Sequence, residues 1–259
     1  MKKTICHIVQ FVLLGLFVTA CTSITSSPSE VFKNQTADQI FLSGEEAIAK
    51  GQYASAVQHF EGLDSLYPFN EHAEQADIDL IYAYYKTGDE PSAVASADRF
   101  IHLYPRSEHV DYVYYMKGLA NYEQDRGWFL RYLPVDISQR DPGTARQAFD
   151  DFGTLLRLFP HSVYAPDAQK RMIYLRNLFA RHDIQVATYY MQRGAYVAAA
   201  NRANYVVQHY QQTPSVIDAL GIMVKAYRKL GLNDRADDAY RVLEVNYPDS
   251  SVLRRVKNS

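Results

Sequence analysis

The stretch GQYASAVQHFEGLDSLYP, residues 51–68, decides the fold because its pattern returns four times along the chain. The further copies span residues 88–105, 143–160, 194–211 and 231–248. Every copy begins with glycine, carries alanine at its sixth position and has an aromatic residue at its seventeenth, and four of the five end in proline. Matches at fixed offsets in five copies predict one structural unit repeated along the chain.

The spacing inside each copy predicts an α-helix. The alanine is followed four and seven positions later by residues such as Phe60 and Leu63, which places one apolar stripe along a helix. Glycine adopts the left-handed backbone conformation that ends a preceding helix, and the final proline stops the next one. We therefore expect each copy to be the second helix of a hairpin, with alanine where two helix backbones approach closely.

This pattern resembles the tetratricopeptide repeat, a pair of antiparallel helices of about 34 residues. The resemblance implies an all-α fold, a right-handed solenoid of about five tetratricopeptide-like hairpins. Successive copies start 37, 55, 51 and 37 residues apart, so the two inner steps are expanded. We expect the first expansion to be a loop from Asp125 to Asp141, which contains glycine and proline. The second is expected to be a long helix from Asp167 to Arg193, which contains neither.

The N-terminus has the form of a bacterial lipoprotein signal. Two lysines precede a short apolar segment, and the sequence LFVTAC ends at Cys21. This sequence resembles the bacterial lipobox, which implies removal of residues 1–20 and acylation of Cys21; several acyl chains anchor a protein stably. Cys6 lies in the removed part, so the mature chain has no partner for a disulfide. Thr22 stands where lipoproteins retained in the inner membrane carry aspartate, which points to the outer membrane.

The chain is expected to divide into four segments: a signal peptide over 1–20, an acylated N-terminus and flexible tether over 21–36, a repeat domain over 37–250 and a C-terminal tail over 251–259. Of the 259 residues, 47% are hydrophobic and 22% charged, which is ordinary globular usage. The formal net charge of −2, without a basic block, argues against nucleic acid as a partner.

Longer strings extend the resemblance to a particular family. DLIYAYYK (79–86), DRFI (98–101), RDP (140–142) and NR (201–202) resemble the BamD family of lipoproteins, also called ComL or YfiO. The resemblance covers essentially the whole mature chain. It implies a non-enzymatic subunit of the β-barrel assembly (BAM) complex, anchored by lipid alone on the periplasmic face of the outer membrane. The implied partners are the periplasmic domains of BamA, other BAM lipoproteins and unfolded outer-membrane β-barrel proteins, and no cofactor is expected.

The first helices of tetratricopeptide arrays line a concave groove, which makes a set of apolar and aromatic residues candidates for peptide binding. The candidates in the second and third hairpins are Ile78, Tyr82, Tyr85, Tyr112, Tyr115 and Tyr122. Such a groove would suit an extended peptide with apolar and aromatic side chains, such as the C-terminal strand of a barrel protein. The same tyrosines would also serve to pack the two hairpins together, and both interpretations stay open.

The C-terminal half carries a second candidate surface, formed by Arg193 and Arg202. The family resemblance implies that Asn201 and Arg202 face BamA. Arginine suits such a contact because its planar guanidinium forms paired hydrogen bonds with carboxylates. Without the resemblance, a solvated surface charge is the better interpretation of either arginine.

Neither a catalytic nor a metal site is expected. The chain contains no Gly-x-Ser-x-Gly, no His-Glu-x-x-His, no glycine-rich phosphate loop and no cysteine pair with metal spacing. His182 and Asp183 adjoin, but neighbours on a helix point about 100° apart, so we interpret them as a helix-surface pair. Two alternatives remain: a generic periplasmic repeat lipoprotein that scaffolds cell-wall or division proteins, and a peptidoglycan hydrolase.

Overall fold

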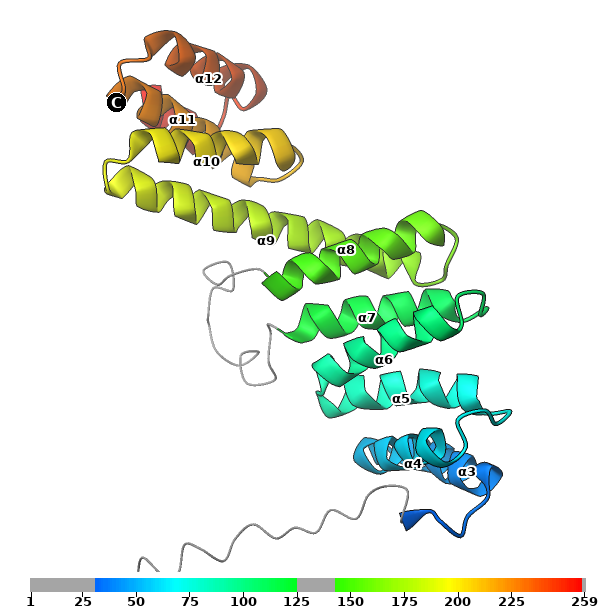
Figure 1. Ribbon diagram of the computed structural model, residues 1–259. Coiled ribbons are helices and arrows are strands. Elements are labelled where there is room, and N and C mark those ends of the chain that lie inside the picture. Colours follow the sequence, from blue (N-terminus) through cyan, green and yellow to red (C-terminus); the bar gives the residue numbers. More distant parts are fainter. Residues whose placement is uncertain (1–30, 125–142, 258–259) are drawn as a thin grey trace, which may run out of the picture. The chain divides into compact units, whose positions relative to one another are not determined.

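The computed structural model describes residues 31–124 and 143–257 (Figure 1). Within these ranges the regular structure is α-helical and no strand occurs, which confirms the all-α prediction. The chain divides into two compact units, residues 1–76 and 77–259, with the boundary inside helix α5. In the same described ranges, none of the helices combines the length and the apolar character that crossing a membrane requires.

The first unit contains one complete hairpin, α3 (Ala37–Ala49) and α4 (Tyr53–Leu66). Helix α3 begins at a capping box, in which the backbone N–H of Gln39 donates to Oγ1 of Thr36 over 3.3 Å and the N–H of Thr36 donates to Oε1 of Gln39 over 3.0 Å. The chain then reverses at Gly51, whose φ of 70° favours glycine. This turn brings α4 back against α3.

Bare glycine backbone lets aromatic rings pack closely in this unit. A Cβ added to Gly44 of α3 would lie 2.6 Å from the ring of Phe60 in α4. Likewise, a Cβ on Gly62 would overlap the ring of Phe32, which is only 5% exposed. The folded body therefore begins at or before Phe32. The flexible tether predicted for 21–36 is too long at its C-terminal end, because a buried phenylalanine fixes that part of the chain.

The second unit continues α5 (Ala73–Thr87), whose first four residues belong to the first unit. Its remaining helices are α6 (Glu90–Leu103), α7 (Val110–Gln124), α8 (Gly143–Leu158), α9 (Ala165–Gln192), α10 (Tyr196–His209), α11 (Ser215–Lys229), α12 (Asn233–Asn246) and α13 (Ser251–Lys257). From α6 onward each helix packs against the next, and Figure 1 shows them stacked in chain order. With α3 and α4, the helices α5 to α12 make the five predicted hairpins.

The five sequence copies form α4, α6, α8, α10 and α12, as the helical spacing predicts. In every copy the alanine and the residue seven positions later are at most 1% exposed. These residues are Ala56, Ala93, Ala148, Ala199 and Ala236, followed by Leu63, Phe100, Leu155, Val206 and Leu243. Burial of each large side chain in this stripe contributes about 1.5–3 kcal/mol. The repeated stripe thus contributes buried apolar side chains in every hairpin.

The helix-ending role predicted for the first glycine of each copy holds in four copies. Gly51, Gly88, Gly194 and Gly231 have φ between 70° and 77°. Gly143 does not adopt positive φ and is instead the first residue of α8. The reason is the insertion before it, which separates Gly143 from the end of α7 at Gln124. The predicted loop from Asp125 to Asp141 lies outside the described residues.

The long helix predicted for the second expansion is confirmed. Helix α9 has 28 residues and is therefore about 42 Å long at 1.5 Å per residue. A proline stands in its first turn, where the missing N–H is tolerated. Helix α9 pairs with α10 in the fourth hairpin and also contacts α8 of the third hairpin and α11 of the fifth.

The segment predicted to be a C-terminal tail over 251–259 is a packed helix in its described part. Val252, Leu253 and Val256 of α13 are at most 8% exposed and belong to one apolar cluster with residues of α11 and α12. A Cβ on Gly221 of α11 would overlap Val252, so α13 lies directly on α11. The last hairpin of a repeat array has no following neighbour, and α13 covers apolar surface that would otherwise face water.

Candidate functional site

Four tyrosines from three successive hairpins form a cluster that we term the aromatic face: Tyr82 of α5, Tyr112 and Tyr115 of α7, and Tyr164 at the start of α9. The Tyr164 ring lies 5.4 Å from that of Tyr112 and 4.8 Å from that of Tyr115, with which it stacks at 17°. Burial, and then the neighbouring Tyr164 and Tyr82, raise the pKa of Tyr112 well above its ordinary value. All four side chains remain partly exposed, so the face can contact both the core and a ligand.

Hydrogen bonds from α9 hold the aromatic face in place. The Tyr115 hydroxyl donates to Oδ2 of Asp167 over 2.8 Å, and Nε of Arg171 donates to the same oxygen over 2.5 Å. Burial, followed by the bond to Asp167, raises the pKa of Tyr115 to about 12. Burial opposes the charge of Asp167, but the bonds from Arg171 and Tyr115 outweigh it and leave the pKa of Asp167 below its ordinary value. The phenol is therefore a protonated, oriented donor at neutral pH.

The six predicted groove residues separate into two groups. The partly exposed residues, which pack at the edge of the core, are Tyr82, Tyr85, Tyr112 and Tyr115. Ile78 and Tyr122 are only 6% and 9% exposed. The Tyr122 ring packs edge-on against Phe152 and Tyr174, at 6.5 Å and 6.0 Å. Ile78 and Tyr122 are therefore packing residues and not groove residues, because their positions on the helix direct both side chains into the core.

Arg202 of α10 pairs with an acidic residue of α9. Its Nη1 donates to Oδ1 of Asp183 over 3.0 Å, and the Arg202 side chain is 42% exposed while that of Asp183 is 1% exposed. The other carboxylate oxygen of Asp183, Oδ2, is buried and has no hydrogen-bond partner among the described residues. The interpretation of His182 and Asp183 as a helix-surface pair is therefore wrong for Asp183. Arg193 lies elsewhere, exposed at the end of α9, with its guanidinium 5.2 Å over the Tyr189 ring.

Two hollows lie further along the second unit. One, of about 340 Å³, lies between α9, α11 and α13 and is lined in part by Asp218, Lys225 and Arg255. The other, of about 300 Å³, lies between α8, α9 and the end of α10, where Arg146 and Arg176 flank aromatic rings. Neither hollow includes a residue of the aromatic face.

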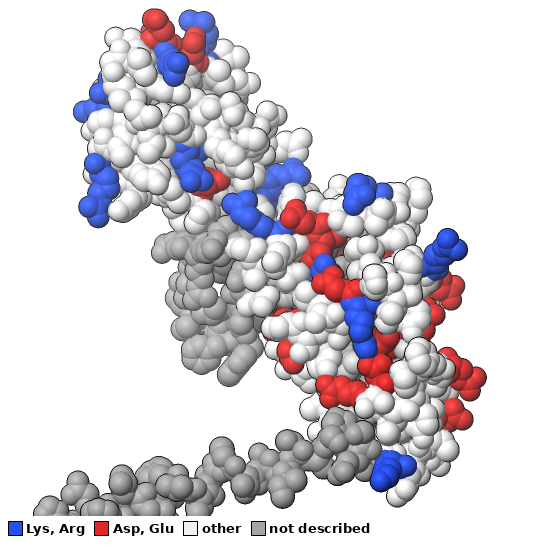
Figure 2. Space-filling model, viewed as in Figure 1, with Lys and Arg blue, Asp and Glu red and all other residues white. Residues whose placement is uncertain are grey.

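Charged side chains of both signs are interleaved on the face of the molecule shown in Figure 2. Lys117 of α7 lies between carboxylates of the two neighbouring helices, with its Nζ 2.7 Å from Oδ1 of Asp98 and 3.2 Å from Oδ1 of Asp151. Asn121 donates a further hydrogen bond to Oδ2 of Asp151 over 2.7 Å. Such pairs join α6, α7 and α8 across their surface.

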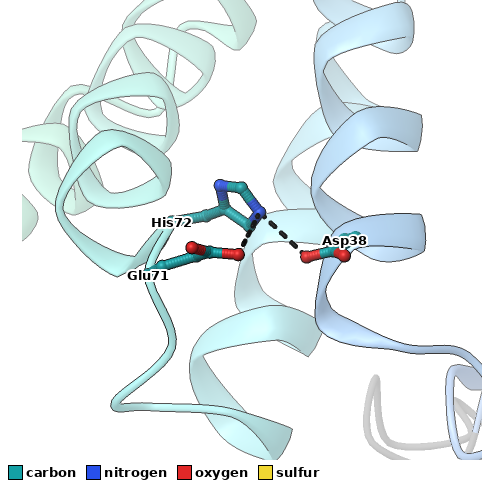
Figure 3. Close-up of side chains that lie close together, drawn as sticks. All are labelled: Asp38, Glu71 and His72. Atoms are coloured by element: carbon teal, nitrogen blue, oxygen red, sulfur yellow. Dashed lines mark hydrogen bonds and ion pairs between the residues drawn. The ribbon is translucent and has the colours of Figure 1, made fainter.

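The first unit brings together three residues that sequence analysis did not connect. Asp38 at the start of α3 meets Glu71 and His72, which lie in the turn before α5 (Figure 3). Asp38 and His72 are 34 residues apart in the sequence. Motifs that place metal ligands on one helix use much shorter spacings, so no such motif would have identified this pair. Only the folded first unit reveals the cluster.

A family model described as "YfiO: Outer membrane lipoprotein" matches residues 33–242. The chain belongs to this family. The match to the YfiO family runs from just before α3 into α12 and therefore includes the aromatic face, Asp183 and Arg202. It confirms the resemblance inferred from the sequence strings.

Relatives named "Outer membrane protein assembly factor BamD" are similar to nearly the whole chain. The protein of Neisseria meningitidis serogroup B is 36% identical over 257 residues, covering 98% of this chain and 95% of the relative. That of Xylella fastidiosa strain Temecula1 is 37% identical over 249 residues, covering 95% and 85%. That of Vibrio cholerae serotype O1 is 36% identical over 234 residues, covering 90% and 97%.

Similar solved structures are more distant in sequence. A thermophilic tetratricopeptide-repeat protein of Thermus thermophilus and the type IV pilus biogenesis factor PilW each share 17% identity, cover 86% of this chain and superpose with a TM-score of 0.37. Superpositions of that quality support no detailed argument. The fold assignment rests on the hairpins and on the YfiO family match.

Proposed function

We propose that this YfiO-family protein is a lipoprotein subunit of the BAM complex, which assembles β-barrel proteins into the outer membrane. The observation that carries the proposal is similarity over nearly the whole chain to relatives that are each named outer membrane protein assembly factor BamD. A repeat array supports such a role because successive hairpins present extended surfaces to partners. We assign it a scaffolding role, without catalysis, in recognition, assembly and insertion of barrel proteins.

The aromatic face is the proposed contact for unfolded barrel proteins. Its rings are partly exposed, and hydrogen bonds from α9 fix Tyr115, so little side-chain freedom is lost when a peptide binds. An extended strand with aromatic side chains fits this chemistry. Tyr82→Ala should weaken binding of a peptide copied from the last strand of a barrel protein by about 1–2 kcal/mol. Tyr122→Ala is the matched control, since its buried ring should change thermal stability but not affinity per folded molecule.

The surface around Arg202 is the proposed contact for the periplasmic domains of BamA. One guanidinium nitrogen bonds to Asp183, and the side chain is still 42% exposed, so other N–H groups can reach a partner carboxylate. Arg193 is a second exposed candidate on the same pair of helices. Other lipoproteins of the complex are further proposed partners.

The proposed anchor is a set of acyl chains on Cys21, which would hold the protein at the periplasmic face of the outer membrane. Cys21→Ser should abolish incorporation of a palmitate analogue and leave the signal peptide uncleaved. The Cys6→Ser variant should be labelled like the wild type. Equal labelling of the Cys21 variant and the wild type would remove the lipoprotein assignment.

Depletion of the protein from its host tests the proposed function. We expect folded barrel proteins, recognised by their heat-modifiable migration on gels, to fall in the outer membrane as the protein is depleted. We do not expect the composition of the cell wall to change before the folded barrel proteins decline. Normal levels of folded barrels together with altered muropeptides would favour a peptidoglycan hydrolase, and normal barrels with a division defect would favour the generic scaffold.

A further inference from the structure

The cluster of Asp38, Glu71 and His72 has no place in the surfaces assigned above. Nε2 of His72 lies 3.0 Å from Oδ1 of Asp38 and 3.9 Å from Oε1 of Glu71. Figure 3 marks both contacts with dashed lines. One possible ligand atom from each residue lies within 4.8 Å of the other two. We propose that these three side chains bind a divalent transition-metal ion, with Zn²⁺ as the ion that their chemistry favours. The proposal departs from the expectation of no metal site and does not rest on the proposed function.

The ligand set fits zinc better than calcium or magnesium. Zn²⁺ accepts imidazole nitrogen and carboxylate oxygen at about 2.0–2.2 Å, which places neighbouring ligands of a tetrahedral ion about 3.4 Å apart. The two distances from His72 Nε2, 3.0 Å and 3.9 Å, lie on either side of that value. Calcium and magnesium prefer oxygen ligands alone. Two carboxylates also supply the charge that neutralises a divalent cation.

The imidazole is held in a fixed position before any ion binds. Its ring stacks on that of Phe41, with the centroids 4.4 Å apart and the planes within 3°. The backbone N–H of His72 donates to Oδ1 of Asn70 over 2.7 Å, and Nδ2 of Asn70 donates to the carbonyl of Tyr67 over 2.5 Å. A ligand whose orientation is already set loses less freedom on binding.

The carboxylates, by contrast, are free to adjust. The side chains of Asp38 and Glu71 are 65% and 81% exposed, whereas that of His72 is 27% exposed. The two acids can therefore turn toward an ion, and water can complete its coordination. An ion held in this way would join the start of α3 to the turn before α5, both within the first unit.

The next repeat provides a comparison site in the same chain. Glu108 and His109 occupy the positions of Glu71 and His72, 37 residues later, and their ligand atoms are 3.5 Å apart. The position that corresponds to Asp38 is Gln75, a neutral amide. The second repeat therefore retains the histidine and one acid but lacks the second charged ligand, so it should bind Zn²⁺ more weakly.

Isothermal titration with ZnCl₂ tests the proposal on the full chain, purified in detergent without a polyhistidine tag and with its thiols alkylated. The wild type should bind one ion. His72→Ala and Asp38→Asn should each weaken binding at least about tenfold, since even outer-shell changes cost that much at metal sites. His109→Ala should bind like the wild type. Zinc should raise the thermal midpoint of the wild type and of the His109 variant only.

Several results would overturn the proposal. The first is the absence of binding by the wild type at about 0.1 mM Zn²⁺, a concentration at which a site of useful affinity would be filled. The second is equal binding by the wild type and by His72→Ala, and the third is loss of binding in His109→Ala. If His72→Ala fails to fold, Asp38→Asn decides the question, because Asp38 is exposed and its neutral amide keeps the shape of the side chain. X-ray absorption of the zinc-loaded protein should show nitrogen and oxygen ligands, and sulfur ligands would contradict the site.

Discussion

The pairing of Arg202 with Asp183 predicts that Arg202→Ala destabilises the protein even without a partner. The substitution removes the hydrogen bond that Arg202 donates to Asp183, a carboxylate that is 1% exposed and whose Oδ2 has no hydrogen-bond partner in the described part of the chain. Breaking a buried ion pair from one side costs roughly 3–5 kcal/mol. Because Arg202 is 42% exposed, water can enter where its side chain was, so we expect a loss of about 2–3 kcal/mol.

A double-mutant cycle separates the buried charge from other effects of the substitution. Asp183→Asn keeps the shape and an acceptor oxygen, and should cost about 1 kcal/mol. In that background Arg202→Ala no longer strands a charge, so its cost should fall by at least about 1 kcal/mol. Arg193→Ala, which removes only an exposed contact with Tyr189, is the matched control and should change stability by less than about 1 kcal/mol.

Urea unfolding, followed by circular dichroism, gives the free energy of unfolding of all four variants. The slope of that free energy against urea concentration is checked for each variant. Additive losses, or a loss below about 0.5 kcal/mol for Arg202→Ala, would refute the assigned burial of Asp183. The outcome also governs any interface experiment, because reduced BamA binding by an Arg202 variant supports the proposed interface only when it is expressed per folded molecule.

Two further predictions concern packing and pH. The Gly118→Ala variant should be about 1–3 kcal/mol less stable than the Gly153→Ala variant. An added Cβ at 118 would lie 2.6 Å from the buried Phe152 ring, whereas a Cβ at 153 would meet only Met172, at 3.5 Å. Equal free energies of unfolding for the two variants would contradict the packing of α7 on α8. Tyr115 has a pKa raised from 10.0 to about 12, so the folded state holds its proton longer, and the stability this contributes is fully present below pH 10 and lost as pH rises toward 12. Tyr115→Phe should remove that part of the alkaline loss, and an unchanged pH profile would count against the buried phenol.

The periodic features of the fold were predictable from the sequence because they depend on local spacing. Apolar residues at four- and seven-residue intervals identify the buried stripe of each second helix, as at Phe60 and Leu63, and both are at most 1% exposed. Absence of glycine and proline between Asp167 and Arg193 likewise predicts most of α9. These signals concern one helix at a time, and the hairpins follow from the repeat.

Features that depend on distant partners were not predictable in the same way. Asp183 is buried because Arg202, 19 residues later, reaches back to it from the next helix. Tyr122 and Tyr115 both lie on the tyrosine-rich helix α7, yet one packs in the core while the other reaches Asp167, 52 residues away. Spacing shows that a face is aromatic, but the rotation of the helix against its neighbours decides which rings stay exposed.

Assembly into a complex is the central claim, and co-isolation from native membranes tests it most directly. The protein should be solubilised in mild detergent from cells that express it at its natural level, captured, and its partners quantified by mass spectrometry. We predict BamA in stoichiometric amount, together with further lipoproteins. Recovery of the intact protein without BamA, or with cell-wall or division proteins in its place, would contradict the assignment to the BAM complex.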